Sequence, residues 1–508
     1  MSKFKYIIYT IFIVLVAYLG VNYWSNFSGA GPAVTPPKGD IAEKIESGNS
    51  PLDVPKNFDL KVFAKNLPGA RVMVQDGLGN FWVSQTSQGK VTLIQTNEKG
   101  EVTEKKAIFK NLNKPHGLAL DPKNGMTLYI AEEGKISKVE LYTEDSLTKI
   151  ADLPTGGRHT TRTIKFGPDN RLYVSIGSSC NVCIEKNKKR AAIYSMKKDG
   201  SDFRKVAGGL RNAVFFTWSY IDGSMWATEM GRDNLGDTLP PDEINIIKKG
   251  KNYGWPYCYG KQVRDKTFKP DKQFDCSKTE RSYINLKAHV APLDLAFVPE
   301  EGWPQDMWYD LLVAYHGSWN RSTPVGYKIK RIKLDDQGNV QGKKDFITGW
   351  LDKDSGKSWG RPVGFLVRPG GVMYVTDDKA GVIYKVTYNQ NKNEGESTGN
   401  DLGKPVTLEY PTKGAKLGKS FVVKGSAKGT WYFEGNFSVR VLNKNNQEIA
   451  SARAQAQGDW MTKEMVPFKA ELTLPKKASG SGFLVLEKAN PSGIPEKAES
   501  IRIPVNFN

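Results

Sequence analysis

The feature that most constrains the fold of this chain is a short pattern that recurs along its middle. Each copy is a turn rich in Gly, Asp, Asn or Pro, followed by a run of apolar and aromatic residues typical of a strand. The copies are residues 76–84, 121–131, 167–175, 221–228, 368–376 and a divergent one at 307–314. The first three begin about 45 residues apart and the fourth follows 54 residues later, close to the period of a propeller blade. Six units over residues 57–388 predict a six-bladed β-propeller, because a single β-sandwich cannot absorb that length.

The residue pattern changes after the repeats. Residues 389–401 are a polar spacer without core-forming side chains. Residues 402–508 contain seven short alternating segments, which are 406–410, 421–425, 437–442, 447–454, 468–474, 482–487 and 501–507. Seven strands in about 100 residues predict a small immunoglobulin-like β-sandwich. Since no sustained helical period occurs after the N-terminus, we expect an all-β protein apart from an N-terminal helix.

The first 26 residues carry a separate signal. Lys3 and Lys5 precede about 18 mostly apolar residues, a length between that of a signal peptide and that of a spanning helix. No small-residue cleavage site follows, and Tyr23 and Trp24 are typical of an interfacial anchor. We therefore expect a transmembrane signal anchor, with the bulk of the chain extracytoplasmic in the cell envelope. A cleaved signal peptide is the alternative. Residues 27–56 are expected to be a linker.

Charge and cysteine content narrow the classes of function. The formal net charge of +19 is explained most simply by a solvated Lys-rich surface, and alternatively by attraction to anionic envelope polymers or an anionic ligand. Nucleic acid is not an expected partner, because no basic helix, RNA-binding signature or zinc-finger spacing occurs. The even set of Cys180, Cys183, Cys258 and Cys276 fits an oxidising compartment. We expect the disulfides Cys180–Cys183 and Cys258–Cys276 rather than a metal site or a redox pair.

The stretch 207–260 brings polar clusters next to short apolar runs, which is typical of loops that build a site on a β scaffold. The four histidines, His116, His159, His289 and His316, all lie beside predicted strand ends. His159 directly precedes the turn at Gly167, on a loop that enters a strand of the propeller. A lone histidine is more often structural than catalytic, but this placement makes His159 a candidate general base.

Several other residues could bind an anionic cofactor or a cation. Arg211 and Asn212 are adjacent and suit a quinone or carboxylate oxygen, because a guanidinium stabilises negative charge; an inter-blade salt bridge is the alternative. Gly231 and Arg232 could present consecutive backbone carbonyls, the kind of ligand that Ca²⁺ takes. Arg361 could hold an anion or pair with a carboxylate.

Taken together, these motifs resemble a known family. The order His159, Gly-Pro-Asp, Leu-Arg-Asn, Glu-x-Gly, Asp-Glu-Ile-Asn and Asn-Tyr-Gly-Trp-Pro resembles the PQQ-dependent sugar dehydrogenases. The motifs Cys-Asn-Val-Cys, Ala-His-x-Ala-Pro-Leu at 288–293, His-Gly-Ser-Trp-Asn-Arg at 316–321 and Gly-Arg-Pro-Val-Gly resemble their L-sorbosone dehydrogenase-like branch. Residues 402–508 resemble the Gmad2-type immunoglobulin-like domain, through motifs around Trp431 and Trp460.

The first resemblance implies pyrroloquinoline quinone (PQQ) and Ca²⁺ near the propeller axis. By motif position, His159 would be the general base and Arg211 would polarise the quinone oxygen. Asn212, Arg361 and His116 would also contact the cofactor, and the carbonyls of Gly231 and Arg232 would bind Ca²⁺. One departure is that Arg158 precedes the histidine where the glucose-oxidising members have Asp. The other is that Gly231-Arg232 replaces a Gly-Pro calcium pair.

The leading hypothesis is an extracytoplasmic PQQ- and calcium-dependent dehydrogenase that oxidises a sugar or related aldose. Its electrons would pass to a quinone or cytochrome partner, and the N-terminal helix would hold it at the membrane. A cofactor-free binding propeller and a metal-dependent, lactonase-type propeller are the alternatives.

Overall fold

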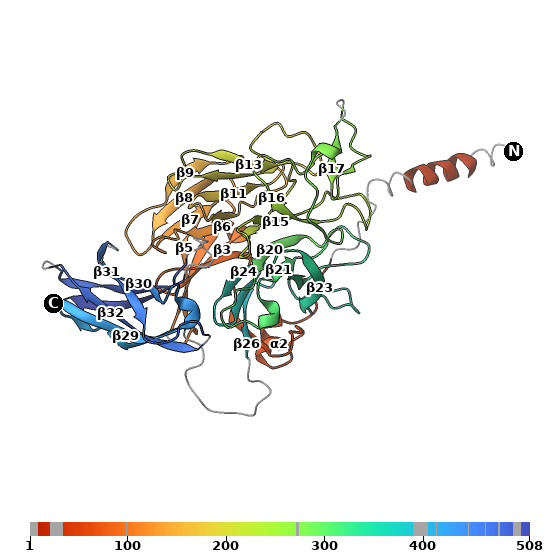
Figure 1. The fold of residues 1–508 in the computed structure, drawn as a ribbon. Coiled ribbons are helices and arrows are strands. Elements are labelled where there is room, and N and C mark those ends of the chain that lie inside the picture. Colours follow the sequence, from red (N-terminus) through yellow and green to blue (C-terminus); the bar gives the residue numbers. More distant parts are fainter. Residues whose placement is uncertain are drawn as a thin grey trace, which may run out of the picture.

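The described residues form six four-stranded antiparallel sheets, one eight-stranded sheet and one two-stranded hairpin (Figure 1). The computed structural model describes residues 9–20, 34–97, 99–270, 274–389, 405–412, 414–444, 447–462, 464–475, 478–490 and 499–507. The six sheets are the blades of a propeller, and the eight-stranded sheet forms the C-terminal domain. The expectation of an all-β chain with a six-bladed propeller is therefore confirmed.

The first three blades use consecutive strands. Blade one contains β2 (Ala70–Gln75), β3 (Phe81–Gln85), β4 (Lys90–Thr96) and β5 (Val102–Phe109). Blade two contains β6 (Gly117–Leu120), β7 (Thr127–Ala131), β8 (Lys135–Glu140) and β9 (Thr148–Asp152). Blade three contains β10 (Ile164–Phe166), β11 (Leu172–Ile176), β12 (Ala192–Met196) and β13 (Arg204–Gly208).

The later blades include an insertion and a closing strand. Blade four contains β14 (Phe216–Trp218), β15 (Met225–Glu229), β16 (Glu243–Ile247) and β19 (Ile284–Asn285), and its insertion carries the hairpin β17 (Cys258–Tyr259) and β18 (Val263–Arg264). Blade five contains β20 (Pro292–Phe297), β21 (Leu311–Tyr315), β22 (Lys328–Leu334) and β23 (Val340–Ile347). Blade six contains β24 (Pro362–Arg368), β25 (Val372–Asp377), β26 (Val382–Tyr388) and, from the other end of the domain, β1 (Phe58–Ala64). Short 3₁₀ turns occur at Thr86–Gln88, Cys276–Lys278, Gln305–Met307 and Gly429–Trp431.

The six repeated segments of the sequence fall on β3, β7, β11, β15, β21 and β25, the second strand of each blade. All residues of β3, β7, β15 and β21 are buried. The second strand of each blade lies between two other strands of its sheet, and its two faces pack against the neighbouring blades. This double burial explains why the repeat reads as a continuous apolar run rather than an alternating one.

The segment before the propeller is more ordered than expected. The short helix α2 (Ile41–Glu46) begins at Asp40, whose Oδ1 accepts a hydrogen bond from the backbone N–H of Ala42 at 2.6 Å. Ile41 and Ile45 are buried in the core of blades five and six. The expected linker at 27–56 is thus packed against the propeller over this part.

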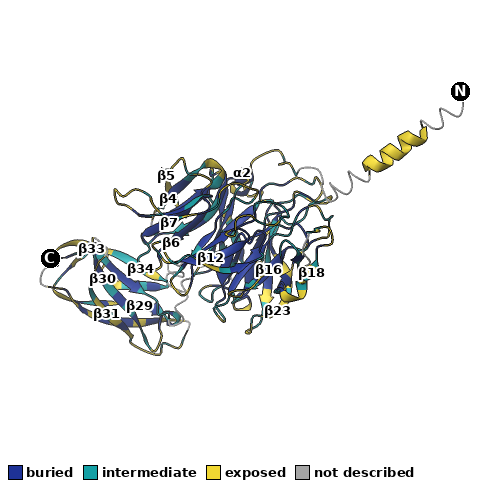
Figure 2. Cartoon of the chain, turned by 90° about the horizontal axis from the view of Figure 1, so that it is seen from above, coloured by how far each residue is buried: buried dark blue, intermediate teal, exposed yellow. Residues whose placement is uncertain are grey.

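Residues 9–20 form an exposed helix that extends away from the propeller (Figure 2). Across the part of the chain that the structure describes, no helix combines the length and the apolar character needed to cross a membrane. The remainder of the expected anchor, residues 1–8 and 21–26, lies outside the described residues.

The C-terminal domain contains strands at all seven expected places. They are β27 (Val406–Tyr410), β29 (Ser420–Lys428), β30 (Asn436–Asn443), β31 (Glu448–Ala456), β32 (Met465–Thr473), β33 (Gly480–Glu487) and β34 (Ser500–Phe507), with the additional short β28 (Lys416–Leu417). Trp431 is fully buried in the domain's core, and Trp460 packs against that core. Lys488 forms ion pairs with Glu499 of this domain and with Glu301 of the propeller, which ties the two domains together.

Candidate functional site

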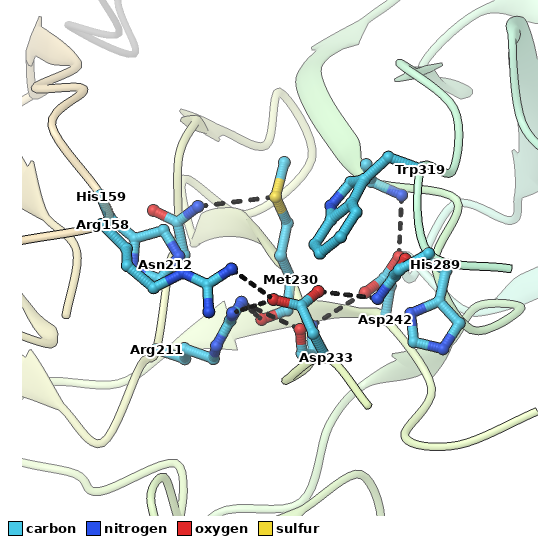
Figure 3. A pocket seen from close by; sticks show the side chains of 12 residues that line it. Arg158, His159, Arg211, Asn212, Met230, Asp233, Asp242, His289 and Trp319 are labelled. Carbon is cyan, nitrogen blue, oxygen red and sulfur yellow. Dashed lines mark hydrogen bonds and ion pairs between the residues drawn. The ribbon is translucent and has the colours of Figure 1, made fainter. Parts of the chain in front are cut away.

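A pocket of about 270 Å³ opens among the loops of blades three, four and five (Figure 3). Its lining residues are Arg158, His159, Arg211, Asn212, Met230, Gly231, Asp233, Asp242, His289, Ala291, Trp319 and Asn320. Four of the seven residues proposed from the sequence, His159, Arg211, Asn212 and Gly231, therefore meet in one place. The loops that supply these residues all lie on the same side of the ring. Residues that are distant in the sequence therefore come together there.

His159 lies on the loop between β9 and β10, and its ring is held by Ser178. Nδ1 lies 2.9 Å from both the carbonyl oxygen and the hydroxyl oxygen of Ser178. The Ser178 hydroxyl donates its own hydrogen to the carbonyl of Cys180 at 2.7 Å, so it can only accept from the ring. Nδ1 of His159 must therefore carry the proton. Nε2 then has a free lone pair, as a proton acceptor requires.

The surroundings keep the imidazole of His159 neutral. Burial, followed by the positive charge of Arg211, lowers the pKa of His159 to about 3. Gly177 allows the ring to sit this close to the sheet, because a Cβ at that position would approach His159 Cβ and Asn212 Oδ1 to 2.6 Å. The ring is thus fixed as a neutral base at the pocket wall.

Arg211 is buried, and its guanidinium is engaged on every side. Nε and Nη2 donate to the backbone oxygen and Oδ1 of Asn181, both at 2.9 Å. Nη1 donates to the carbonyls of Gly231 at 2.9 Å and Met230 at 3.3 Å. Nη2 also pairs with the Asp233 carboxylate at 3.0 Å. The guanidinium therefore organises the pocket floor, and Arg211, on the loop between blades three and four, forms an ion pair with a carboxylate of blade four.

These contacts bear directly on the expected calcium site. The Gly231 carbonyl already accepts a hydrogen bond from a cation, and a second cation on the same oxygen would be repelled by Arg211. The Arg232 side chain turns to Asp265 at 2.8 Å and to Thr267 at 2.9 Å. In this arrangement Ca²⁺ does not fit at the Gly231 carbonyl, because Arg211 would first have to move.

Two buried carboxylates complete the pocket floor. Asp233 accepts from Asn320 at 2.8 Å and lies 3.5 Å from the exposed guanidinium of Arg158. Asp242 accepts from the backbone N–H groups of Gly231 and Ala291, both at 2.8 Å. Burial raises the pKa of Asp242 to about 7. Both aspartates follow Gly231 and Arg232 closely in the sequence, but no pattern there shows that they would join three blades.

The structure does not bring Arg361 and His116 to this pocket. Arg361 donates to the backbone oxygens of His316, at 3.0 Å, and Gly317, and its guanidinium lies over the Tyr327 ring. His116 is completely buried beside Phe215, and its Nε2 has no hydrogen-bond partner within the described ranges. Neither side chain therefore lines the cavity in which His159 and Arg211 meet.

Both expected disulfides are present, Cys180–Cys183 and Cys258–Cys276. The first closes a small loop that contacts the pocket residues His159 and Arg211. Cys180, Cys183 and Glu185 are the sole group of three or more potential metal-binding His, Cys, Asp or Glu side chains among the residues that can be described. Because both sulfurs are used in the disulfide, this group is not a metal site.

The sequence analysis gave no role to the aromatic and polar groups at the rim. Trp319 is 55% exposed and leans over the pocket beside Met230 (Figure 3). His289 has Nε2 at 2.8 Å from the carbonyl of Gly236, so that nitrogen carries the proton and the ring has the opposite tautomer to His159. A cavity with an aromatic lip and a polar floor suits a small polyhydroxylated ligand.

Comparison with known proteins agrees with this fold. The model of the TrAA12-like family matches residues 52–389, and that of the immunoglobulin-like domain of bacterial spore germination (Gmad2) matches residues 405–493. An uncharacterized protein of Borreliella burgdorferi is 34% identical over 371 residues, 68% of this chain and 94% of that protein. A PQQ-dependent pyranose dehydrogenase of Coprinopsis cinerea is 25% identical over 404 residues, 66% of this chain and 54% of that enzyme.

Solved structures show the same propeller. A calcium structure of a Trichoderma reesei carbohydrate-active enzyme of family AA12 superposes with a TM-score of 0.58 at 20% identity, over 66% of this chain and 97% of that one. The holo form of the Coprinopsis cinerea pyranose dehydrogenase PQQ domain gives a TM-score of 0.56 at 21% identity, over 70% of this chain and 99% of that domain. The expected resemblance to PQQ-dependent sugar dehydrogenases is confirmed, and the chain belongs to the TrAA12-like family, with a C-terminal Gmad2 domain.

Proposed function

We propose that this protein oxidises a hydroxyl group of a sugar or related aldose, with PQQ as the cofactor that accepts the hydride. The observation that carries the proposal is the pairing of a neutral histidine base with a buried guanidinium in one pocket. His159 presents a free Nε2, and Arg211 and Asn212 line the same pocket. Oxidation of an alcohol requires both a proton acceptor and positive charge near the group that receives the electrons.

The donor set of the pocket fits PQQ, which is a planar quinone with three carboxylates. Arg158 is exposed, and the ion pair that it forms with Asp233 is long at 3.5 Å. The amide of Asn212 donates only weakly, to Met230 Sδ at 3.5 Å. Both groups can therefore turn toward carboxylate or quinone oxygens without breaking a strong contact. When bound, PQQ would supply the two-electron acceptor that the side chains lack.

One feature of the free pocket opposes catalysis. An efficient general base has a pKa near the working pH, whereas the pKa of His159 is about 3. Part of this depression comes from the positive charges of Arg211 and Arg158. An anion bound between them would offset that charge and raise the pKa of His159. The histidine would then become a stronger base only when the cofactor is in place.

We further propose an extracytoplasmic location at the cell envelope, with the N-terminal residues as an anchor and a quinone or cytochrome as electron acceptor. The two disulfides support an oxidising compartment. The C-terminal domain would act as an envelope-facing spacer or binding module. For calcium, the contact of Arg211 with Gly231 argues against the expected site in this arrangement.

The test is dye reduction by the purified protein over a panel of neutral and acidic sugars, with and without PQQ. The proposal expects activity that requires PQQ. If PQQ neither binds nor supports dye reduction, the cofactor-free binding propeller replaces it. A lactonase would instead hydrolyse a lactone without any electron acceptor.

A further inference from the structure

The loop of residues 178–183, closed by the Cys180–Cys183 disulfide, touches both of the residues to which the proposed function assigns chemistry. It connects β11 to β12 in blade three, whereas Arg211 comes from the loop that enters blade four. Its contacts fall into two groups, one at His159 and one at Arg211.

In the first group of contacts, Ser178 binds His159. Both oxygens of Ser178 accept from Nδ1 at 2.9 Å, which fixes the tautomer and the plane of the ring. The Ser178 hydroxyl is in turn anchored on the carbonyl of Cys180, a disulfide residue, at 2.7 Å. The next residue, Ser179, accepts from the backbone N–H of Arg158 at 2.8 Å. The orientation of the histidine therefore depends on where the disulfide holds this loop.

In the second group of contacts, Asn181 binds Arg211 and the loop that carries Asp233. Its Oδ1 accepts from Arg211 Nη2 at 2.9 Å and from the backbone N–H of Asp233 at 2.8 Å. Its Nδ2 donates to the backbone oxygen of Asp233 at 3.1 Å. Its own backbone oxygen accepts from Arg211 Nε at 2.9 Å. One residue thus fixes a buried guanidinium and a loop of blade four.

The chain connects the two groups of contacts directly. The backbone N–H of Ser178 donates to the carbonyl of Arg211 at 2.7 Å. Between Ser178 and Asn181 lie only Ser179 and Cys180, and Cys183 closes the loop from the other side. A disulfide across so few residues leaves the backbone little freedom to rotate the Ser178 and Asn181 contacts independently.

We propose that this disulfide-closed loop sets the distance and orientation between His159 and Arg211, with Asn181 as its main positioning residue. The inference rests on the proposed function for its catalytic consequence and on the contacts above for its structural part. Opening the loop releases both groups at once, and a small misplacement of reacting groups costs about 100-fold in rate.

The first test compares two pairs of cysteine substitutions. Cys180→Ser/Cys183→Ser opens the pocket loop, and Cys258→Ser/Cys276→Ser opens the disulfide in the blade-four insertion, outside the pocket lining. The second disulfide closes the longer loop, with a sequence separation of 18 against 3, so its loss should lower thermal stability more. Activity should follow the opposite order, with kcat falling ~10- to 100-fold only in the first pair.

A second comparison covers the case in which the cysteine variants fail to fold. Asn181→Ala removes three side-chain hydrogen bonds to Arg211 and Asp233. Asn187→Ala changes the same residue type on the same connection, where the side chain accepts from the backbone N–H of Lys189 instead. Asn181→Ala should lower kcat more than it raises KM, because it disturbs alignment rather than binding. Asn187→Ala should match the wild type.

An independent readout uses the ring of His159 in the protein without PQQ. Because the chain has four histidines, each ring can be followed by NMR over a titration from pH ~8 to pH ~4.5. In the wild type the His159 signal should stay constant, and in both loop variants its titration should move up toward the ordinary value of about 6.5. Unchanged His159 signals in both loop variants overturn the positioning role.

The two readouts separate the two proposals. If the wild type shows no PQQ binding and no sugar oxidation, the proposed function fails, and the NMR comparison still decides whether the loop positions His159. If the wild type is active and the loop variants match it in kcat and in the NMR titration, the loop inference fails alone.

Discussion

Replacing His159 with glutamine should separate catalysis from acid stability. His159→Gln removes the only atom in the pocket to which we assign proton transfer, so kcat/KM should fall ~10²- to 10⁴-fold. The matched control is His289→Gln, which changes a second histidine of the same pocket whose Nε2 proton is directed at the Gly236 carbonyl. That variant should lose less than ~10-fold, because no proton transfer is assigned to it.

The acid stability of the same variant can be worked out from the structure. Burial and Arg211 hold the native pKa of His159 at about 3, whereas the unfolded chain has a value of about 6.5. The unfolded state therefore takes up a proton first as the pH falls, and stability present above pH ~6.5 is lost progressively toward pH ~3. Between pH ~7 and pH ~5, His159 alone should lower the wild-type free energy of unfolding by ~2 kcal/mol.

The assay is urea unfolding of the wild type and of His159→Gln at both pH values, followed by tryptophan fluorescence. The variant should lose less stability between the two pH values than the wild type, although it is nearly inactive. A variant that retains activity within ~3-fold of the wild type would refute the role of His159 as the base. An equal loss of stability in the two proteins would refute the burial of a neutral imidazole.

Three further predictions concern the same pocket. Gly177→Ala should lower kcat ~10- to 100-fold, because its Cβ would press on His159 and Asn212 at 2.6 Å; wild-type kinetics would show that the ring position is not critical. Arg211→Met removes a guanidinium from the Gly231 carbonyl, so the cofactor-free variant should bind Ca²⁺ more tightly than the wild type in a calorimetric titration. Equal Ca²⁺ affinities of the two proteins would contradict the competition between Arg211 and Ca²⁺ for that carbonyl. Addition of PQQ should raise the pKa of His159 in an NMR titration, since its carboxylates offset the charge of Arg211; an unchanged titration would place PQQ elsewhere or show that it does not bind.

The architecture was predictable because it depends on local patterns. Each repeated turn and apolar run became the second strand of a blade, where burial on both faces requires such a run. The seven strands of the C-terminal domain were predictable because apolar and polar residues alternate along each of them. The two cysteine pairs were assigned because few pairings were possible.

The contents of the pocket were only partly predictable. His159, Arg211 and Asn212 meet as expected, because each lies where a loop enters an inner strand. No sequence pattern shows that Arg211 binds the carbonyl of Gly231 or that Asn181 holds Arg211, because those contacts join separate loops that are distant in the sequence. The Ile41 and Ile45 side chains of α2 are also missed, since six residues are too few for a helical period.

The pairing of β1 with β26 has a consequence for how this protein withstands damage. The strand Phe58–Ala64 runs antiparallel to the last strand of the propeller, with Phe58 opposite Tyr388. The ring is therefore closed by a pair of strands that come from opposite ends of the domain. A protease that cuts between residue 64 and blade one would leave β1 held in place by its hydrogen bonds to β26 and by the packing of Phe58 in the core. Removal of the residues up to 64 would instead leave the edge of β26 unpaired and open to a strand from another molecule.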